Sequence, residues 1–397
     1  MSNPKRIGAV LAATILATLA TSTAHATGGY VYTPLNPQRI LDTRDGGGPV
    51  GPNGVYTLHV SGAGAPVPAN ATEIVFNLTA TDSTDSSFVT VYPDGTARPA
   101  TSNLDFPANA STANLVMAQI GTDGSIDIWN HSGTVDLIAD LAGYYAPGST
   151  GTFQPVASTR ILDTRNGIGT PGGSAAGLGQ NSTLGLQVSG IAGVPTTGVT
   201  AVVLDLVATN GTDASFLDAY PDGSPMPDAS SVDFGPSQTV ANLVVLPVTD
   251  GKVDIWNHTG SVDVVADIYG YYTSGSGETF TPTTPTRVLD TRTGTQIGPN
   301  GVAPVRVTGS TTGIPATAGA VVVHFATVNA TQDSSLTLYP DSPVQPDTSN
   351  LNFTPLRVTS NLAIILVGED GYIDIWNHFG STDVVADVVG YYAQPTS

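Results

Sequence analysis

One six-residue stretch occurs three times in this 397-residue chain, and it limits the fold more than any other feature. The stretch, Ile/Val-Asp-Ile-Trp-Asn-His, lies at residues 126–131, 253–258 and 373–378. Each copy is preceded by a Leu-Asp-Thr-Arg block and followed by a turn, an apolar run and Gly-Tyr-Tyr. Successive Leu-Asp-Thr-Arg blocks are 121 and 127 residues apart. A repeat of this length is typical of complete domains that each bury a core, not of the short units of a solenoid.

The repeats and the segments between them divide the chain into four parts. Residues 1–26 have a basic start, an apolar run and a small-x-small site at Ala24-His25-Ala26, which is the pattern of a secretory signal peptide. The three domains are predicted at 27–147, 148–274 and 275–397. Short Gly/Ser-rich stretches join them, so we expect the domains to be neighbours.

Short apolar runs, separated by Gly, Pro, Asn and Asp clusters, predict strands throughout the three repeats. No segment after the predicted signal keeps a helical period of apolar residues. Six to nine short strands in about 120 residues are typical of a β-sandwich. The predicted fold is therefore all-β, with three tandem antiparallel β-sandwich domains that are either jelly-roll or immunoglobulin-like.

Composition excludes several classes of function and fold. Cysteine is absent, so neither disulfides nor thiolate metal sites stabilise the domains. The formal net charge is −20, which repels phosphate backbones and argues against nucleic-acid binding. No later stretch approaches the roughly 20 apolar residues that a membrane-spanning helix needs. We therefore expect an acidic, exported protein without a membrane span.

The Arg-x-Leu-Asp-Thr-Arg blocks carry most of the positive charge of the predicted domains. An aspartate lies within the apolar run before each Gly-Tyr-Tyr, where an unpaired carboxylate would be costly. We expect structural ion pairs between the first and last strands of each domain, formed by the residues Arg44 and Asp140, Arg165 and Asp267, and Arg292 and Asp387. The alternative is that these arginines bind a carboxylate ligand through the guanidinium fork.

The tryptophan and histidine of the repeated stretch are the candidate ligand-binding residues. Strand alternation places Asp127, Trp129 and His131 on one face, away from Ile126 and Ile128. An aromatic face next to Asn, His and Asp could stack on a sugar ring, and three copies would add avidity. The alternative is a tryptophan that packs at the rim of the sandwich. The candidate binding residues are Trp129, His131, Trp256, His258, Trp376 and His378.

Metal and catalytic signals are weaker. Each domain has one such histidine and no second one beside it, which argues against a zinc site. Asp-rich loops at residues 82–85, 210–213 and 329–333 have oxygen ligands for loosely bound calcium, although turn-forming residues explain them equally well. We expect no other cofactor. The motifs of serine hydrolases, zinc peptidases and P-loop enzymes are absent.

Several motifs together resemble a known kind of module. They are Arg-Ile/Val-Leu-Asp-Thr-Arg, Gly-Val/Ile-Pro at 193–195 and 313–315, Tyr-Pro-Asp, Ser-Asn-Leu-x-Phe, Trp-Asn-His and Gly-Tyr-Tyr. As a set they are similar to the secreted repeat modules of actinobacterial-type exported proteins, some of which resemble accessory domains of cell-wall amidases. The resemblance covers nearly all of the chain after residue 26. It implies an extracellular, envelope-associated and non-catalytic role.

The sequence therefore predicts a secreted, non-catalytic repeat protein, extracellular or associated with the cell surface. Its expected partner is a cell-envelope polysaccharide or a surface protein. One alternative is a structural or adaptor subunit of a larger secreted assembly. A polysaccharide-acting hydrolase is the other alternative, since the many aspartates could supply a carboxylate pair. Three near-equal copies of every motif argue against a single-site enzyme.

Overall fold

The structure is a computed structural model that describes residues 29–148 and 151–395. The predicted signal peptide, residues 1–26, lies outside the described residues. Within them the chain forms 24 strands, β1 to β24, and two short 3-10 turns, η1 (Pro171–Gly173) and η2 (Thr291–Thr293). In these described ranges, no helix has the length and apolar character needed to cross a membrane.

The strands fall into three sets of eight, one set for each sequence repeat. Domain 1 contains β1 (Val31–Asp42), β2 (Val55–His59), β3 (Glu73–Thr81), β4 (Ser87–Pro93), β5 (Leu104–Phe106), β6 (Thr112–Gln119), β7 (Ser125–Asn130) and β8 (Asp136–Ala146). Domain 2 contains β9 (Thr152–Asp163), β10 (Ser182–Gln187), β11 (Val199–Thr209), β12 (Ser215–Pro221), β13 (Val232–Phe234), β14 (Val240–Pro247), β15 (Lys252–Asn257) and β16 (Asp263–Thr273). Domain 3 contains β17 (Thr279–Asp290), β18 (Gly301–Arg306), β19 (Ala318–Val328), β20 (Ser334–Pro340), β21 (Leu351–Phe353), β22 (Thr359–Leu366), β23 (Tyr372–Asn377) and β24 (Asp383–Ala393).

Each domain is a sandwich of two four-stranded antiparallel sheets. In domain 1 one sheet has the order β1-β8-β3-β6 and the other has the order β2-β7-β4-β5, and domains 2 and 3 repeat both orders with their own strands. Eight strands that are divided between two sheets with these two orders form a jelly roll. The fold is therefore three tandem jelly-roll sandwiches, which decides between the two sandwich types that the sequence left open. We call the sheet that contains β3, β11 or β19 the inner sheet, and its partner the outer sheet.

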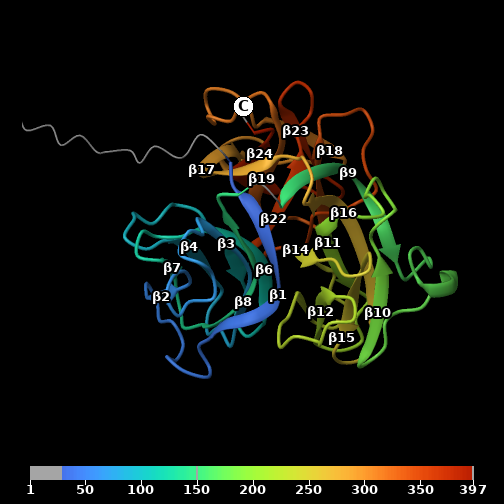
Figure 1. Ribbon diagram of the computed structural model, residues 1–397, viewed down its shortest axis with the longest axis horizontal. Coiled ribbons are helices and arrows are strands. Elements are labelled where there is room, and N and C mark those ends of the chain that lie inside the picture. The colour runs from blue at the N-terminus through green and yellow to red at the C-terminus, as the bar shows by residue number, and fades with distance from the viewer. Residues whose placement is uncertain (1–28, 149–150, 396–397) are drawn as a thin grey trace, which may run out of the picture.

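The three domains surround a common axis, with one sandwich at each corner of a triangle (Figure 1). The second tyrosine of each Gly-Tyr-Tyr lies on this axis. The hydroxyl oxygens of Tyr145 and Tyr272 are 2.6 Å apart, those of Tyr272 and Tyr392 are 2.8 Å apart, and those of Tyr145 and Tyr392 are 2.5 Å apart. All three rings are fully buried, so the domains meet at a closed ring of hydroxyl hydrogen bonds.

The first residue of each Gly-Tyr-Tyr has a steric role. A Cβ on Gly143 would overlap the ring of Tyr32, the aromatic residue two positions before the first proline of the domain. The same overlap arises between Gly270 and Phe153. The aromatic residue at the start of each repeat therefore packs on the glycine of Gly-Tyr-Tyr at its end, where the first strand pairs with the last.

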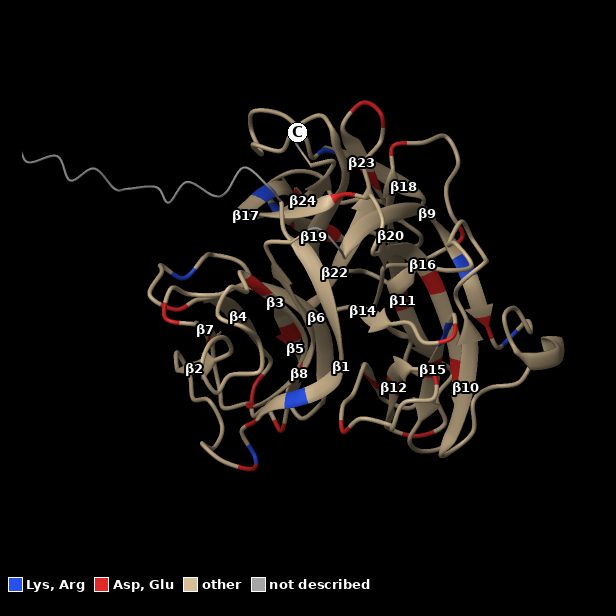
Figure 2. Ribbon diagram, viewed as in Figure 1, with Lys and Arg blue, Asp and Glu red and all other residues tan. Residues whose placement is uncertain are grey.

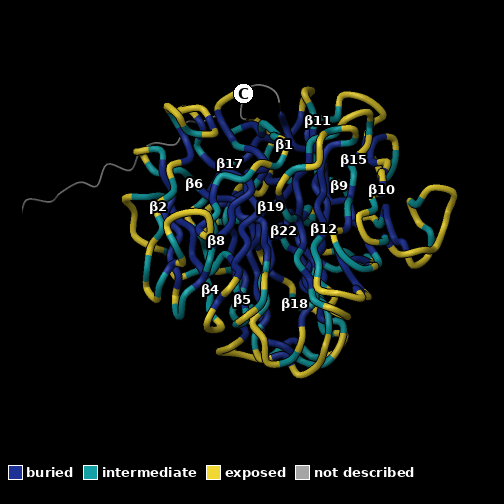
Figure 3. The backbone as a smooth tube through the Cα atoms, turned by 90° about the horizontal axis from the view of Figure 1, so that it is seen from below, coloured by how far each residue is buried: buried dark blue, intermediate teal, exposed yellow. Residues whose placement is uncertain are grey.

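The inner sheets are buried on both faces. In β3, the side chains of Ile74, Phe76 and Leu78 fill the sandwich of domain 1, while Val75 belongs to a cluster shared with the other two domains. Strands buried on both faces lose the alternation of apolar and polar residues. Domains 1 and 2 each have a core of their own, and the core of domain 3 is continuous with the shared cluster around the axis. Figure 3 shows the buried backbone gathered in the middle, with exposed loops around it.

The chain between domains also takes part in the assembly. The backbones of Phe153 and Glu278 exchange two hydrogen bonds of 2.8 Å. Tyr30 and Phe280 exchange two more, which join the start of domain 1 to the start of domain 3. The backbone N–H of Tyr32 also donates to the carbonyl of Gly151 at 2.9 Å, so backbone hydrogen bonds link the starts of all three domains.

Candidate functional site

The tryptophan and asparagine of the repeated stretch end β7, β15 and β23, and the histidine is the first residue after each strand, next to the last turn of each domain. As predicted, Ile126 and Ile128 are buried in the sandwich core, whereas Trp129 and His131 contact each other on the opposite face. Asn130 has no exposed surface, and its amide donates hydrogen bonds to the carbonyls of Val50, Gly51 and Gly133. The matching asparagines of domains 2 and 3 make the same three kinds of bond. The asparagine therefore holds the turn and is not free for a ligand.

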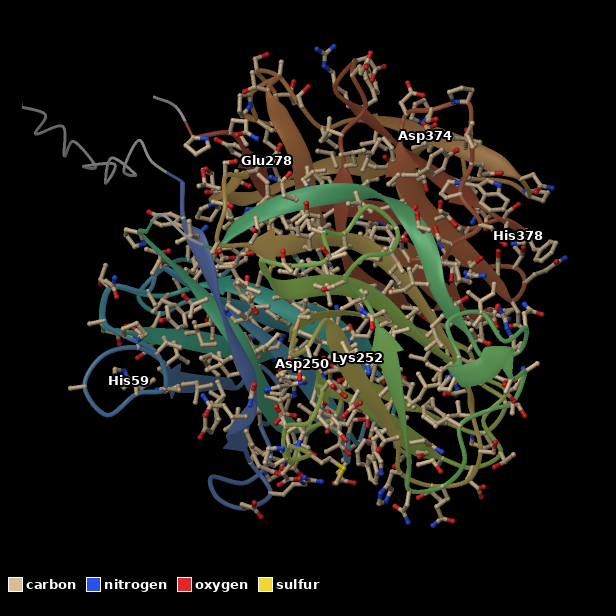
Figure 4. All side chains as sticks on the ribbon, turned by 45° about the vertical axis from the view of Figure 1, so that its right-hand side comes forward. His59, Asp250, Lys252, Glu278, Asp374 and His378 are labelled. Atoms are coloured by element: carbon tan, nitrogen blue, oxygen red, sulfur yellow. The ribbon has the colours of Figure 1, made fainter. Side chains whose placement is uncertain are left out.

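An aromatic cluster forms around this stretch on the outer sheet of each domain. The ring of His131 stacks on Phe88 at 4.7 Å between centroids, and Trp129 meets Phe88 edge-on at 5.7 Å. In domain 2, His258 stacks on Phe216 at 4.9 Å and Trp256 lies 5.4 Å from His258. Figure 4 labels His378 of domain 3 at the periphery of the molecule, far from the axis.

Domain 3 builds the same stack from a different position in the sequence. Ser335 lies at the strand position that Phe88 and Phe216 hold in the other domains. The ring of Phe379, one residue after the histidine, stacks on His378 at 4.0 Å instead, and 52% of Phe379 is exposed. All three domains thus carry a His-Phe stack beside a tryptophan.

The three clusters are not equally accessible. The guanidinium of Arg98 lies 3.6 Å from the centroid of Trp129, and Trp129 is only 8% exposed. Met226 and Gln345 follow the corresponding Tyr-Pro-Asp segments in domains 2 and 3, where Trp256 and Trp376 are half-buried. A cation over an aromatic face is favourable and covers the face that a sugar ring would use. Domain 1 therefore has a covered tryptophan, and domains 2 and 3 have more open ones.

The ion pairs differ from the predicted ones. Arg44, Arg165 and Arg292 do not pair with Asp140, Asp267 and Asp387, so that prediction is wrong. The Nε of Arg39 lies 3.0 Å from Asp140 Oδ1, and the equivalent pairs are Arg160 with Asp267 at 2.9 Å and Arg287 with Asp387 at 2.7 Å. Ion pairs do join the first and last strands, but through the first arginine of each block.

The strand register explains this correction. Arg39 lies directly opposite Asp140 in the antiparallel pairing of β1 with β8. Arg44 lies beyond the end of β1, where its Nη2 reaches Asp42 at 2.6 Å and lowers the pKa of that carboxyl. Arg165 pairs in the same way with Asp163, and Arg292 with Asp290. The last arginine of each block therefore stabilises the turn that follows the first strand.

The Asp-rich loops also have structural roles. Asp82, Asn210 and Asn329 have positive φ angles of 50° to 55°, which Asp and Asn tolerate in turns. The hydroxyl of Thr84 accepts a hydrogen bond from the backbone N–H of Thr134, which ties this loop to the turn after the histidine. Among the described residues, no group of three or more His, Cys, Asp or Glu side chains is placed to hold a metal ion.

The contacts between domains follow the threefold arrangement, with one exception. We call them interfaces 1–2, 2–3 and 3–1. At interface 1–2 Arg39 lies 3.5 Å from Asp228 of domain 2, and at interface 2–3 Arg160 lies 3.9 Å from Asp347 of domain 3. At interface 3–1 the corresponding residue is Ala100, so Arg287 keeps only the contacts within its own domain, with Asp387 and with Asp290 at 3.1 Å. Lys and Arg are few compared with Asp and Glu on this molecule, so few arginines are available to pair with an aspartate of a neighbouring domain (Figure 2).

A cavity of about 250 Å³ lies at interface 3–1. Its buried lining includes Glu73 of domain 1 and His324 and Asp387 of domain 3, which are 2%, 5% and 3% exposed. Glu73 Oε2 and His324 Nε2 are buried without a hydrogen-bond partner. Sequence reasoning missed this site. The available signals were a rare glutamate at the start of an apolar strand and a histidine within another one.

Comparisons with known proteins give no family for this chain. No family model matches it, and no curated protein matches it. Two solved structures are similar over most of its length. The first is an atomic structure of Sulfolobus Turreted Icosahedral Virus, at 10% identity and a TM-score of 0.20, with 92% of this chain and 91% of that chain covered.

The second is an archaeal virus structure described by its triple jelly-roll fold and turret assembly. Its identity is 8% and its TM-score is 0.20, with 93% of this chain and 92% of that chain covered. At such TM-scores the likeness carries no argument about function. The jelly-roll assignment here rests on the strand order of the six sheets.

Proposed function

We propose that this protein is a secreted, non-catalytic binding protein whose outer-sheet aromatic clusters attach it to a neutral polysaccharide of the cell envelope. The His-Phe stack beside each tryptophan is the observation that supports this most. Domain 3 has lost the strand phenylalanine and rebuilds the stack with Phe379. A purely internal packing role would not need an aromatic ring that remains 52% exposed.

The arrangement of the clusters suits a polymer. The stretches carrying them belong to three outer sheets around the axis, so a long ligand could meet more than one cluster (Figure 1). Each added contact raises the effective concentration for the next, so three weak sites can produce a much higher affinity. The net charge of −20 favours neutral over polyanionic glycans, because like charges repel.

Co-sedimentation of the full mature chain with insoluble polysaccharides tests this proposal. The probes are purified cell wall, chitin and cellulose. We expect binding to at least one of them, and a loss of about 10-fold or more for the double variant Trp256→Ala, Trp376→Ala, taking about 1–3 kcal/mol per ring, the size of nucleobase–aromatic stacking, as the scale. Leu356→Ala is the control, since this side chain is 94% exposed and belongs to none of the clusters.

Arg98→Met refines the same test. It places the domain 2 residue over Trp129 and removes the guanidinium from that ring. We expect Arg98→Met to bind the polysaccharide a few-fold more tightly than wild type. If the double tryptophan variant binds as wild type does, or if none of the probes binds, the glycan proposal is wrong.

A further inference from the structure

The three interfaces have equivalent residues, and a comparison of these residues locates a site. In strand register, Ala142, Tyr269 and Val389 hold the same place in β8, β16 and β24, two residues after the ion-paired aspartate and just before the glycine of Gly-Tyr-Tyr. Tyr269 is 3% exposed and packs in the shared cluster at interface 2–3. Ala142 lines a space of only about 20 Å³ at interface 1–2, whereas Val389 lines the cavity of about 250 Å³ at interface 3–1.

Interface 1–2 is closed by hydrogen bonds that interface 3–1 lacks. The amide of Asn77 donates to the carbonyl of Ser230 at 2.5 Å, and the backbone N–H of Ser230 donates to Asp140 Oδ2 at 3.4 Å. The equivalent residues at interface 3–1 are His324, Ser102 and Asp387. In the described chain no hydrogen bond joins Ser102 to Asp387, and the Ser102 hydroxyl donates to Asp105 of its own domain. This segment of domain 1 contacts domain 3 farther along, where the backbone N–H of Asp105 donates to the hydroxyl of Ser360 at 3.1 Å, but it makes no hydrogen bond to Asp387.

The cavity has a closed floor and an open mouth. Glu73, His324 and Asp387 form the buried floor, and the exposed residues Thr96 and Thr284 belong to its rim. Apolar contact is available from Met117, Ala118, Pro285 and Val389. A cavity of this size is below the usual range for drug-sized ligands, so its occupant must be compact.

The unpaired polar atoms on the floor define the chemistry of the occupant. Asp387 is neutralised by Arg287, but no cation lines the cavity next to Glu73. The matching positions to Glu73 are Ala201 and Ala320, so this carboxyl occurs once around the axis. A buried carboxyl oxygen without a partner costs about 1–3 kcal/mol, and a ligand that donates to it recovers this cost. We infer that the cavity at interface 3–1 binds a small organic amine, with its ammonium group on Glu73 and its apolar part against Val389 and Met117.

Binding of an amine depends on the protonation state of Glu73. Burial raises the pKa of Glu73, so the empty site favours the neutral acid. The groups around it are His324 and Asp387 across the cavity and the hydroxyls of Tyr145, Tyr272 and Tyr392 on the axis. An ammonium ion would favour the carboxylate, and the proton of Glu73 would then pass to the buffer. Binding should therefore release a proton and tighten as the pH rises from 5 to 8.

Titration calorimetry of the full mature chain tests the inference with cyclohexylamine, and with cyclohexanol as the neutral probe of the same shape. We expect cyclohexylamine to bind with at least a 10-fold lower Kd than cyclohexanol, with proton release shown by two buffers of different ionisation enthalpy. Glu73→Gln should reduce the affinity at least 10-fold. Val389→Tyr, which introduces the domain 2 residue, should abolish binding by filling the cavity.

Control variants separate a lost site from a lost fold. Glu369→Gln changes an exposed glutamate that does not line the cavity and should bind as wild type does. Each variant must keep the far-ultraviolet circular dichroism and the elution volume of wild type. If a folded Glu73→Gln protein binds the amine as wild type does, if cyclohexanol binds equally well, or if neither probe binds, the inference is wrong. The outcome is independent of polysaccharide binding, which uses the outer sheets.

Discussion

Interfaces 2–3 and 3–1 are built from equivalent strands, but the first is filled by a tyrosine side chain and the second contains a cavity. At interface 2–3, Tyr269 packs in the shared cluster and Arg160 reaches Asp347 of the next domain. At interface 3–1, the equivalent residues are Val389 and Ala100, and a cavity remains. The ion pairs, the tyrosine ring and the strand order are common to all three domains. The motifs that all three domains share maintain the assembly, whereas different side chains at a few equivalent positions accompany the larger cavity at interface 3–1.

Tyr269→Val should have the largest effect, because it converts interface 2–3 toward interface 3–1. The ring is 3% exposed, and removing most of a buried aromatic side chain costs about 2–4 kcal/mol. We expect the midpoint of thermal unfolding to fall, as measured by scanning calorimetry. Tyr271→Val is the matched control, since this neighbouring tyrosine is only half-buried and should cost less. Equal losses for both variants would show that Tyr269 does not fill a special position.

Asp205→Asn probes the buried acid of interface 2–3. Both carboxyl oxygens of Asp205 lack a partner, and burial raises its pKa well above the usual carboxyl range. A raised pKa in the folded state means that the wild type loses stability as the pH rises above the unfolded value. The asparagine variant has no such loss. We therefore expect it to be more stable than wild type by about 1–3 kcal/mol at pH 8, with a smaller gain at pH 4.5.

Thermal melts of both proteins across this pH range measure the difference. Asp263→Asn is a control on the same inner sheet, whose carboxylate already accepts hydrogen bonds from Thr164 and Asn210. A gain for Asp205→Asn that is greater at pH 4.5 than at pH 8 would contradict the account.

Val389→Tyr is the converse of the first change and should make interface 3–1 resemble interface 2–3. Filling a cavity typically adds about 0.5–2 kcal/mol when the new side chain fits. We expect a higher unfolding midpoint in the absence of any ligand. Val389→Thr, which adds no volume, should not raise it. A clear loss of stability for the folded tyrosine variant would mean that the space cannot accept a ring and that the two interfaces are not equivalent.

Ala100→Asp should have the smallest effect. It restores the acidic residue that the other interfaces place beside the arginine, so Arg287 gains a partner across interface 3–1. Exposed ion pairs contribute about 0.2–1 kcal/mol, and salt screens them. The gain should appear in urea unfolding at low ionic strength and disappear at 1 M NaCl. Ala100→Asn should produce no salt-dependent gain, and a gain that persists at 1 M NaCl would contradict the pairing.

The sequence was sufficient to predict much of the fold. The apolar runs of domain 1 at residues 55–60, 73–80, 88–92, 114–120, 125–130 and 135–144 predict six of its eight strands, including β7 with its two faces. It missed β1, because Pro34 and Pro37 interrupt the pattern and the pairing shifts register there, and β5, which has only three residues. The threefold arrangement also had a signal. In β11 the positions that would alternate to the outer face are also mostly apolar, with Asp205 as the main exception, which indicates burial on both faces.

The candidate sites were harder to predict, since they depend on contacts across the assembly. The choice between Arg39 and Arg44 as the partner of Asp140 depends on a strand register that spacing alone does not set. The covering of Trp129 by Arg98 depends on the path of a loop. Glu73 and His324 are far apart in sequence and belong to different domains, so only the closed ring of domains brings them to one cavity.

The most direct test is a crystal structure of residues 27–397 grown with cyclohexylamine. We expect one amine molecule at interface 3–1, with its nitrogen at hydrogen-bonding distance from the carboxyl of Glu73, and none beside Tyr269 at interface 2–3. A cavity that holds only ordered water, or an amine bound equally at interface 2–3, would contradict it.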